Sequence, residues 1–185
     1  MKRLFAAIKI EPDPNLIKIY NDLRVSVSYE KINWVSEKNI HITLKFFGET
    51  PENRIDTICD VFDEIKVKYD PFLIRLKDIG IFGSRYNPRV IWFGMDKCPE
   101  VEKLAEEVIN NLEDAGFEHD GQNFRPHLTV GRIKMINDKH RFQQNIDKLK
   151  NIFIQEVPVN EFHLYESILR PQGPIYNLVE NFKLG

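Results

Sequence analysis

His41-Ile42-Thr43-Leu44 and His127-Leu128-Thr129-Val130 are two short strand-like segments with the same chemical pattern. Each one alternates a histidine and a threonine with two apolar residues. Successive side chains of a strand point to opposite faces, so the histidine and threonine share one face and the apolar pair takes the other. The motifs lie about half a chain length apart, which predicts two similar lobes that present their histidines across one cleft.

Strand and helix patterns extend on both sides of these motifs. Apolar runs predict strands at residues 3–10, 32–35, 40–47, 72–82, 89–95, 125–133, 153–169 (one strand or two, interrupted at Pro158) and 175–182. Apolar residues at helical spacing predict four helices, which begin at residues 13–14, 50–51, 99 and 138. The mixture predicts an α+β fold, a single bilobal domain over residues 1–185 with pseudo-two-fold symmetry. We expect two antiparallel sheets that face a central cleft and carry helices on their outer faces.

Composition narrows the class of partner. The chain has 185 residues, 42% of them hydrophobic and 29% charged, as in an ordinary globular protein, and its formal net charge is −2. That balance disfavours sequence-independent binding to duplex nucleic acid, but it is compatible with a compact ligand that carries one or two phosphates. Cys59 and Cys98 form no CxxC pair, and the N-terminal apolar run is too short for a signal peptide. We therefore expect a cytoplasmic monomer that has no membrane partner.

Paired histidines are suited to acid–base chemistry at phosphorus. The ordinary pKa of histidine is about 6.5, so one neutral imidazole can take a proton while a second, protonated one gives a proton. Each such transfer is worth about 10²–10⁴ in rate. His41 and His127 on opposite sides of one phosphorus atom would suit in-line displacement at a phosphodiester, and the residues by themselves leave open which is the acid.

Three further side chains are candidates for binding the phosphate. The hydroxyls of Thr43 and Thr129 can donate to non-bridging phosphoryl oxygens. Arg132 offers a guanidinium, but strict alternation would turn it away from Thr129, so we predict that either a strand end or a bulge at Gly131 re-aims it. Alternation also places Lys45 on the face of Thr43, either as a phosphate or backbone contact or as a solvated residue.

A metal site is the main rival interpretation. It would need additional Cys, His, Asp or Glu ligands at supporting spacings. Neither motif has an acidic residue at such a spacing on its own strand face, and His119, His140 and His163 lack a partner motif. We therefore interpret those three histidines as structural or exposed, and we expect no metal and no cofactor.

The two motifs and their flanks resemble the 2H phosphoesterase superfamily, in particular its bacterial and archaeal RNA 2′,3′-cyclic phosphodiesterase branch, also called 2′-5′ RNA ligases. The resemblance covers nearly the whole chain. It is carried by residues 3–8 (RLFAAI), 41–48 (HITLKFFG), 88–92 (PRVIW), 124–132 (FRPHLTVGR), 164–167 (LYES) and 173–176 (GPIY). Val130 stands where the family usually has leucine.

This resemblance implies metal-independent hydrolysis of a terminal RNA 2′,3′-cyclic phosphate to a 2′-phosphomonoester. By analogy, His41 is the proton donor to the leaving 3′ oxygen and His127 is the proton acceptor that activates water. Thr43, Thr129 and Arg132 hold the phosphate. The expected partner is therefore an RNA that ends in a 2′,3′-cyclic phosphate, and 2′-5′ ligation is a side activity of some relatives.

Aromatic residues near the motifs are candidates for stacking on a terminal base: Phe124 first, then Trp34, Phe47 and Tyr165. For each of them a place in the core is the alternative. Two alternatives to the function also stay open. One is a 2H reaction on small cyclic nucleotides or nucleotide-sugar cyclic phosphates, and the other is a non-catalytic RNA-end binding module.

Overall fold

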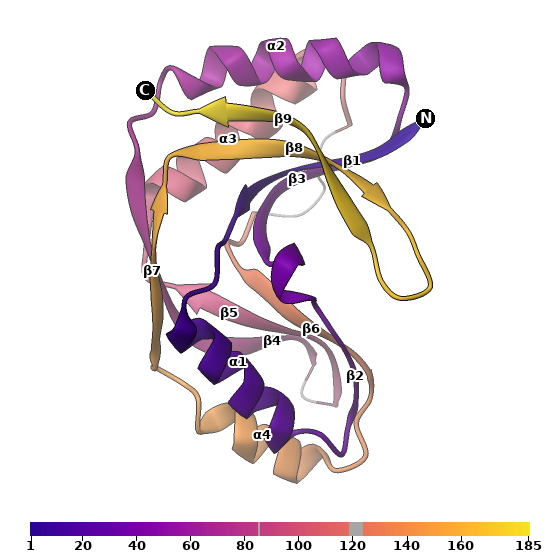
Figure 1. The fold of residues 1–185 in the computed structure, drawn as a ribbon, viewed down its shortest axis with the longest axis vertical. Helices are drawn as coiled ribbons and strands as arrows, with labels where there is room; N and C mark the ends of the chain where they lie inside the picture. The colour runs from indigo at the N-terminus through magenta and orange to yellow at the C-terminus, as the bar shows by residue number, and fades with distance from the viewer. Residues whose placement is uncertain (85, 119–123) are drawn as a thin grey trace.

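The chain mixes helices with strands and β-hairpins, as the periodicity predicts. The structure is a computed structural model that describes residues 1–84, 86–118 and 124–185 (Figure 1). The strands are β1 Lys2–Lys9, β2 Lys31–Trp34, β3 His41–Thr50, β4 Phe72–Ser84, β5 Asn87–Met95, β6 Leu128–Met135, β7 Phe153–Val159, β8 Glu161–Ile168 and β9 Ile175–Lys183. The helices are α1 Pro14–Ser26, α2 Ile55–Lys66, α3 Pro99–Asp114 and α4 Lys139–Asp147, with short 3-10 turns η1 Glu37–Asn39 and η2 Glu52–Arg54.

The strands form one curled antiparallel sheet. Its order is β7-β4-β5-β6-β3-β1-β8-β9, and β2 pairs with β6 beside that path. This corrects the prediction of two separate sheets, because β6 and β3 are joined through a single residue pair, Ile42 opposite Leu128. The sheet therefore has two halves, and they meet at Ile42 and Leu128. Each of these is the apolar residue between the histidine and the threonine of its motif.

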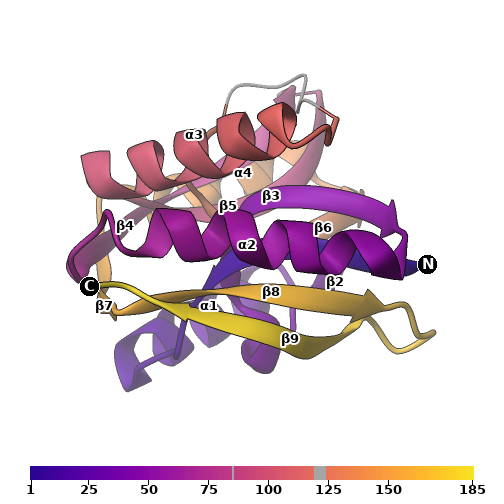
Figure 2. The ribbon, with the colours of Figure 1, turned by 90° about the horizontal axis from the view of Figure 1, so that it is seen from above.

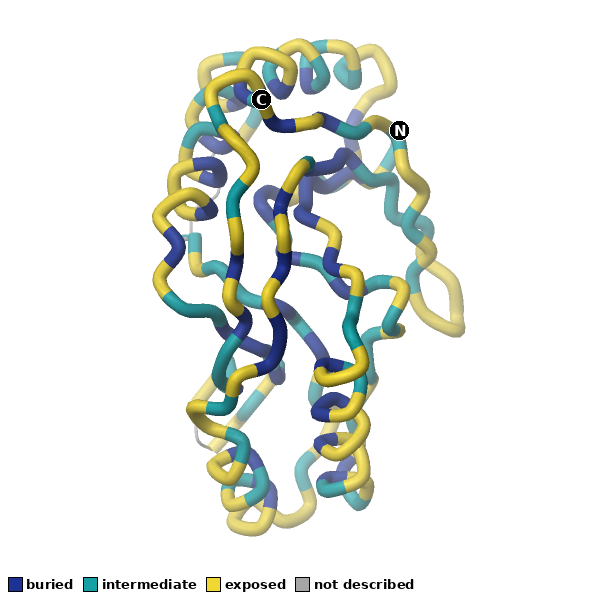
Figure 3. Tube along the Cα trace, turned by 60° about the vertical axis from the view of Figure 1, so that its left-hand side comes forward, coloured by how far each residue is buried: buried dark blue, intermediate teal, exposed yellow. Residues whose placement is uncertain are grey.

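A pair of helices covers each half of the sheet. Helices α2 and α3 contact each other and pack on β9 and β3, whereas α1 and α4 contact each other and α1 packs on β7. Figure 1 shows these pairs at opposite ends of the molecule, Figure 2 shows α2 and α3 side by side when that end is seen from above, and Figure 3 shows buried positions along the central strands. The ring of Phe62 on α2 meets Phe162 and Phe182 edge-on, which fixes this helix on β8 and β9. No helix in the described residues is long and apolar enough to cross a membrane.

Local capping and edge effects set several boundaries. Asp13 caps α1 by accepting the N–H of Leu16, and Pro14 takes the first helical position, both as predicted. Helix α2 begins later than predicted because the 3-10 turn η2 precedes it. Pro158 lies inside β7 rather than between strands. It is tolerated there because β7 is an edge strand, where a missing N–H breaks no ladder.

Candidate active site

The joint between the two halves brings both motifs together. Because β3 and β6 run antiparallel about the pair Ile42–Leu128, the flanking residues of one motif lie beside those of the other. His41 therefore lies on the side of Thr129, and His127 on the side of Thr43. Strand alternation turns all four side chains to the face opposite that apolar pair, which is fully buried in the core.

Both imidazoles are oriented by the same kind of hydrogen bond. The Nδ1 atom of His41 lies 2.7 Å from the carbonyl oxygen of Asn39, and Nδ1 of His127 lies 2.7 Å from the carbonyl oxygen of Arg125. A carbonyl oxygen only accepts, so Nδ1 carries the proton in each ring. The Nε2 atoms are left to exchange protons with a substrate, and the two halves thus hold two equivalent acid–base groups.

Aromatic rings surround the two histidines unequally. The His41 ring lies 5.0 Å from Phe5 and 5.4 Å from Tyr176, measured between ring centroids. The His127 ring meets Phe82 edge-on at 4.7 Å. Burial is the largest cause that lowers the pKa of each histidine below its ordinary value, and the charge of Arg132 lowers both further. A charge on His127 also lowers the pKa of His41, so the three groups lie within electrostatic reach of one another.

A bulge in β6 turns Arg132 toward the histidines. On β5, Trp92 pairs with Thr129, Ile91 with Gly131 and Val90 with Arg132. Val130 lies between Thr129 and Gly131 and therefore has no partner on β5. Trp92 and Val90 are two residues apart and share a face, and therefore Thr129 and Arg132 also share one. The prediction that a bulge re-aims Arg132 is confirmed, with the extra residue at Val130 rather than at Gly131.

The same irregularity occurs in β3, one residue after its threonine. Thr43 pairs with Ala7 and Lys45 pairs with Ala6, which leaves Leu44 as the extra residue. Lys45 consequently turns toward the core, is 3% exposed and donates to the carbonyl oxygen of Glu118 at 2.9 Å. The prediction that Lys45 shares the face of Thr43 is wrong, because it assumed unbroken alternation.

The bulge in β3 places an unpredicted aromatic residue on the histidine face. Phe46 follows Thr43 by the same three positions that separate Arg132 from Thr129. It is 58% exposed, and its ring lies 5.9 Å from the ring of Phe5. Phe5 and Tyr176 were missed as well, because Phe5 is hidden in an apolar run and Tyr176 lies in a strand whose residues show no repeated chemical pattern.

The four aromatic residues considered for base stacking fall in different places. Trp34 packs edge-on against the core residue Tyr20, and Phe47 packs on Phe62 and Phe117, so both belong to the core. Tyr165 stacks on Phe5 at 5.4 Å, beside the histidines. Phe124 is half-buried and packs against the core just before the second motif, and its stacking role stays a prediction.

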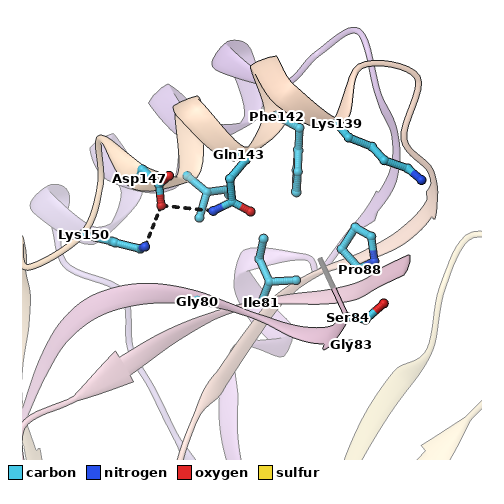
Figure 4. Close-up of a pocket in the computed structure, with 11 residues that line it drawn as sticks. Gly80, Ile81, Gly83, Ser84, Pro88, Lys139, Phe142, Gln143, Asp147 and Lys150 are labelled. Atoms are coloured by element: carbon cyan, nitrogen blue, oxygen red, sulfur yellow. Dashed lines mark hydrogen bonds and ion pairs between the residues drawn. The ribbon is translucent and has the colours of Figure 1, made fainter. Parts of the chain in front are cut away.

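Two pockets flank the sheet. One, of about 570 Å³, lies beside His41 and is lined by Phe5, Tyr165, Tyr176 and His163 among others. The other, of about 430 Å³, lies between α4 and the β4–β5 hairpin (Figure 4). Its carboxylate, Asp147, accepts from Gln143 and pairs with Lys150, and no histidine lines it. Of the two motif histidines, only His41 lines the first pocket, and neither lines the second.

The remaining histidines do not assemble a metal site within the described residues. Nε2 of the buried His163 lies 3.3 Å from Oε1 of Glu161. The other carboxylate oxygen, Oε2, accepts a hydrogen bond from the side-chain amide of Asn181. His140 is exposed on α4, and His119 lies outside the described residues. Among residues 1–84, 86–118 and 124–185, no group of three His, Cys, Asp or Glu side chains is placed to hold a metal ion.

Comparison with known families gives a match over most of the chain. The family model described as LigT like Phosphoesterase matches two stretches, residues 8–92 and 94–176. The first stretch contains His41 and the second contains His127.

Similar proteins are found among curated and solved chains. An RNA 2′,3′-cyclic phosphodiesterase of Methanocaldococcus jannaschii is 33% identical over 97% of this chain and 99% of its own length. Another of Archaeoglobus fulgidus is 34% identical over 98% and 99%. The crystal structure of TT0787 of Thermus thermophilus is similar with a TM-score of 0.80, 25% identity and coverage of 98% and 97%. E. coli LigT, solved in complex with 3′-AMP, shares the fold with a TM-score of 0.78, 22% identity and coverage of 99% and 98%.

Proposed function

This chain belongs to the LigT-like phosphoesterase family, and on that premise we propose that it is an RNA 2′,3′-cyclic phosphodiesterase. The observation that carries the proposal is the mirrored pair of imidazoles, each with its Nδ1 bound to a carbonyl and its Nε2 left for the substrate. Arg132 shares their face and supplies the cation that a phosphate requires. The relatives that align over nearly their full length carry this activity by name.

The reaction proceeds by one in-line displacement. Nε2 of neutral His127 takes a proton from water, and the water oxygen forms a bond to phosphorus. The bond from phosphorus to the 3′ oxygen breaks, and Nε2–H of protonated His41 gives its proton to that oxygen. Thr43, Thr129 and Arg132 hold the non-bridging oxygens, on which negative charge develops. The product is a 2′-phosphomonoester with a free 3′ hydroxyl, and proton exchange with solvent restores both histidines.

The surroundings of the histidines support this assignment of roles. His41 is packed between Phe5 and Tyr176 and lines the pocket that has room for a nucleoside, so the leaving 3′ oxygen belongs on its side. The hydrogen bond that orients His127 is exposed to solvent, which suits the residue that activates water. When the phosphate binds, its negative charge raises the pKa of His41 and favours the protonated form that the acid requires.

Hydrolysis of an oligoribonucleotide that ends in a 2′,3′-cyclic phosphate tests the proposal. In EDTA the wild-type protein is expected to form the 2′-phosphate, because all catalytic groups proposed are side chains of the chain itself. Substitution of His41→Ala or His127→Ala should each lower kcat by about 10²–10⁴. His140→Ala, an exposed histidine on α4, is the matched control and should leave kcat unchanged. A 3′-phosphate product, loss of activity in EDTA, or full activity in both single variants would contradict the mechanism.

The same site admits one close alternative, which is hydrolysis of small cyclic nucleotides or nucleotide-sugar cyclic phosphates. The pocket of about 570 Å³ beside His41 is large enough for a mononucleotide, and this observation keeps the alternative open. Ligation through a 2′-5′ linkage is the same displacement with a 5′ hydroxyl in place of water at His127: the bond from phosphorus to the 5′ oxygen forms and the bond to the 3′ oxygen breaks. Tight binding of RNA ends without turnover would instead indicate a binding module.

A further inference from the structure

Tyr176 on β9 lies against His41 on β3, although β1 and β8 separate these two strands in the sheet. Tyr176 pairs with Ser167, which follows Tyr165 by two residues and shares its face of β8. Tyr165 in turn pairs with Phe5, whose ring meets that of His41. The Tyr176 ring is 5.4 Å from the His41 ring and 4.7 Å from the Phe5 ring, measured between centroids, and both contacts are edge-on. The curl of the sheet therefore brings its edge strand to a motif histidine.

The hydroxyl of Tyr176 is unpaired in the described part of the chain. By contrast, the hydroxyl of the core residue Tyr20 donates to the carbonyl oxygen of Val35. The Tyr176 side chain is half-buried and lines the pocket beside His41, where its hydroxyl oxygen stays accessible. This hydroxyl is therefore available to a ligand that enters the pocket.

The surrounding charges indicate which way the phenol faces. Burial is the largest influence on Tyr176 and raises its pKa, whereas the charges of Arg132 and Arg3 lower it. For Tyr165, burial and two carboxylates, of which Glu161 has the larger effect, raise the pKa to about 12. The Tyr176 phenol thus lies in the field of Arg132, the proposed phosphate ligand, and the Tyr165 phenol lies in the field of carboxylates. Because its pKa is raised overall, Tyr176 keeps its proton at neutral pH and can donate a hydrogen bond.

Asn39 fixes Tyr176 and His41 relative to each other. Its side-chain amide donates to the carbonyl oxygen of Pro174 at 2.8 Å, two residues before Tyr176. Its backbone carbonyl oxygen lies 2.7 Å from Nδ1 of His41 and accepts from it. One residue of η1 thus ties both the start of β9 and the imidazole to the same point. The position of the phenol beside His41 is therefore set by hydrogen bonds as well as by ring contact.

We propose that Tyr176 is a further catalytic residue, whose hydroxyl donates a hydrogen bond to a non-bridging phosphoryl oxygen of the substrate alongside Arg132. The inference rests on the proposed function and adds a donor to its mechanism. Negative charge grows on the non-bridging oxygens as water attacks phosphorus, and a donor fixed in advance stabilises that charge. The phenol keeps its own proton throughout. Because it is neutral, it does not lower the pKa of the neighbouring acid, His41, as a second cation would.

Tyr176→Phe tests the role of the hydroxyl, because it keeps the ring against His41 and removes only the donor. With adenosine 2′,3′-cyclic phosphate as substrate, kcat should fall about 10²-fold, as for the loss of other donors to a developing oxyanion. The pH at which kcat/KM peaks should stay where it is, since no charge is removed. Tyr29→Phe is the control: its hydroxyl accepts from Asn145, away from the histidines, and its kcat should equal that of the wild-type protein.

Tyr165→Phe compares the two phenols of the pocket. It removes the hydroxyl that lies in the field of Glu161, and its loss of kcat should be much smaller than that of Tyr176→Phe. Thermal unfolding checks that each variant is folded.

Asn39→Ala tests how the phenol is held. The variant loses the hydrogen bond to Pro174 but keeps the backbone carbonyl that orients His41, so kcat should fall about tenfold. In a Tyr176→Phe background the same substitution should cause no further loss, since the hydroxyl that it positions is already absent. An equal loss in both backgrounds would show that Asn39 does not act through Tyr176 and would overturn its assignment as a positioning residue.

Three outcomes would overturn the catalytic role of Tyr176. These are full kcat in Tyr176→Phe, a shift of its pH peak that shows an action through His41, and a larger loss of kcat in Tyr165→Phe. In each of them the wild-type protein still hydrolyses the cyclic phosphate, so the proposed function stands. If the wild-type protein does not turn over any 2′,3′-cyclic phosphate, the proposed function fails and this inference fails with it.

Discussion

Individual residues in this site act through the charges and rings around them. Burial first, and then the charge of Arg132, lowers the pKa of both His41 and His127. Lowering the pKa of an imidazole favours its neutral form. The base, His127, needs that neutral form, whereas the acid, His41, must first bind a proton. Arg132 therefore has two effects, since it attracts the phosphate and also sets the proton affinity of the pair.

A pH profile measures this effect directly. The dependence of kcat/KM on pH reports the pKa values of the free enzyme, so its bell should peak below about pH 6.5. Arg132→Gln should lower the rate and move the peak to higher pH, because removing the positive charge lets both histidines bind protons more easily. Arg24→Gln, a substitution on α1, is the control and should leave the position of the peak unchanged. A peak above about pH 7 in the wild-type protein would contradict the lowered pKa values.

At the scale of elements, the β4–β5 hairpin supports the second motif through its aromatic residues. Trp92 lies opposite Thr129, its ring is 5.3 Å from Phe82, and Phe82 meets His127 edge-on. The indole lies across Gly80, where an added Cβ would be 2.1 Å from Cζ2 of Trp92. A side chain at position 80 would therefore collide with the Trp92 ring, which packs on the Phe82 ring that meets His127.

Gly80→Ala should accordingly displace Trp92. We expect the free energy of unfolding to fall by about 1–3 kcal/mol, as for other overpacked sites, and kcat to fall with it. Gly116→Ala is the control. Gly116 has a positive φ of 80°, a conformation that costs an alanine about 1–2 kcal/mol of stability, and it lies after α3, away from the histidines. Chemical denaturation and kcat measured on both variants separate a loss of stability from a loss of positioning. Unchanged kcat in Gly80→Ala would show that the hairpin rings do not orient His127.

At the scale of the whole molecule, the two halves of the sheet share one joint. Ile42 and Leu128 are fully buried, and their pairing is the contact through which β3 and β6 hold the histidines at a fixed separation. The helices that cover each half pack away from this joint, at opposite ends of the molecule in Figure 1. The separation of the two acid–base groups is therefore set by core packing and not by the site itself.

Leu128→Ala tests that dependence. The cavity should cost about 2–5 kcal/mol of stability, and kcat should fall because the two motifs can shift relative to each other. Leu112→Ala, a fully buried leucine on α3, should cost a similar amount of stability and leave the kcat of the folded protein unchanged. Equal kcat in the two variants, measured where both are folded, would show that the joint does not control the site.

The elements, the α+β class and the candidate residues could be predicted from the amino-acid sequence, because they follow from local periodicity and from a motif that occurs twice. His41, Thr43, His127 and Thr129 were identified from alternation within four residues, which needs no knowledge of the rest of the fold. The continuity of the sheet through Ile42 and Leu128, and the bulge after each threonine, became visible in the folded structure alone. Those bulges turn Lys45 into the core and Phe46 and Arg132 onto the histidine face. A bulge depends on how a strand registers with its neighbours across the sheet, and single-strand periodicity does not contain that information.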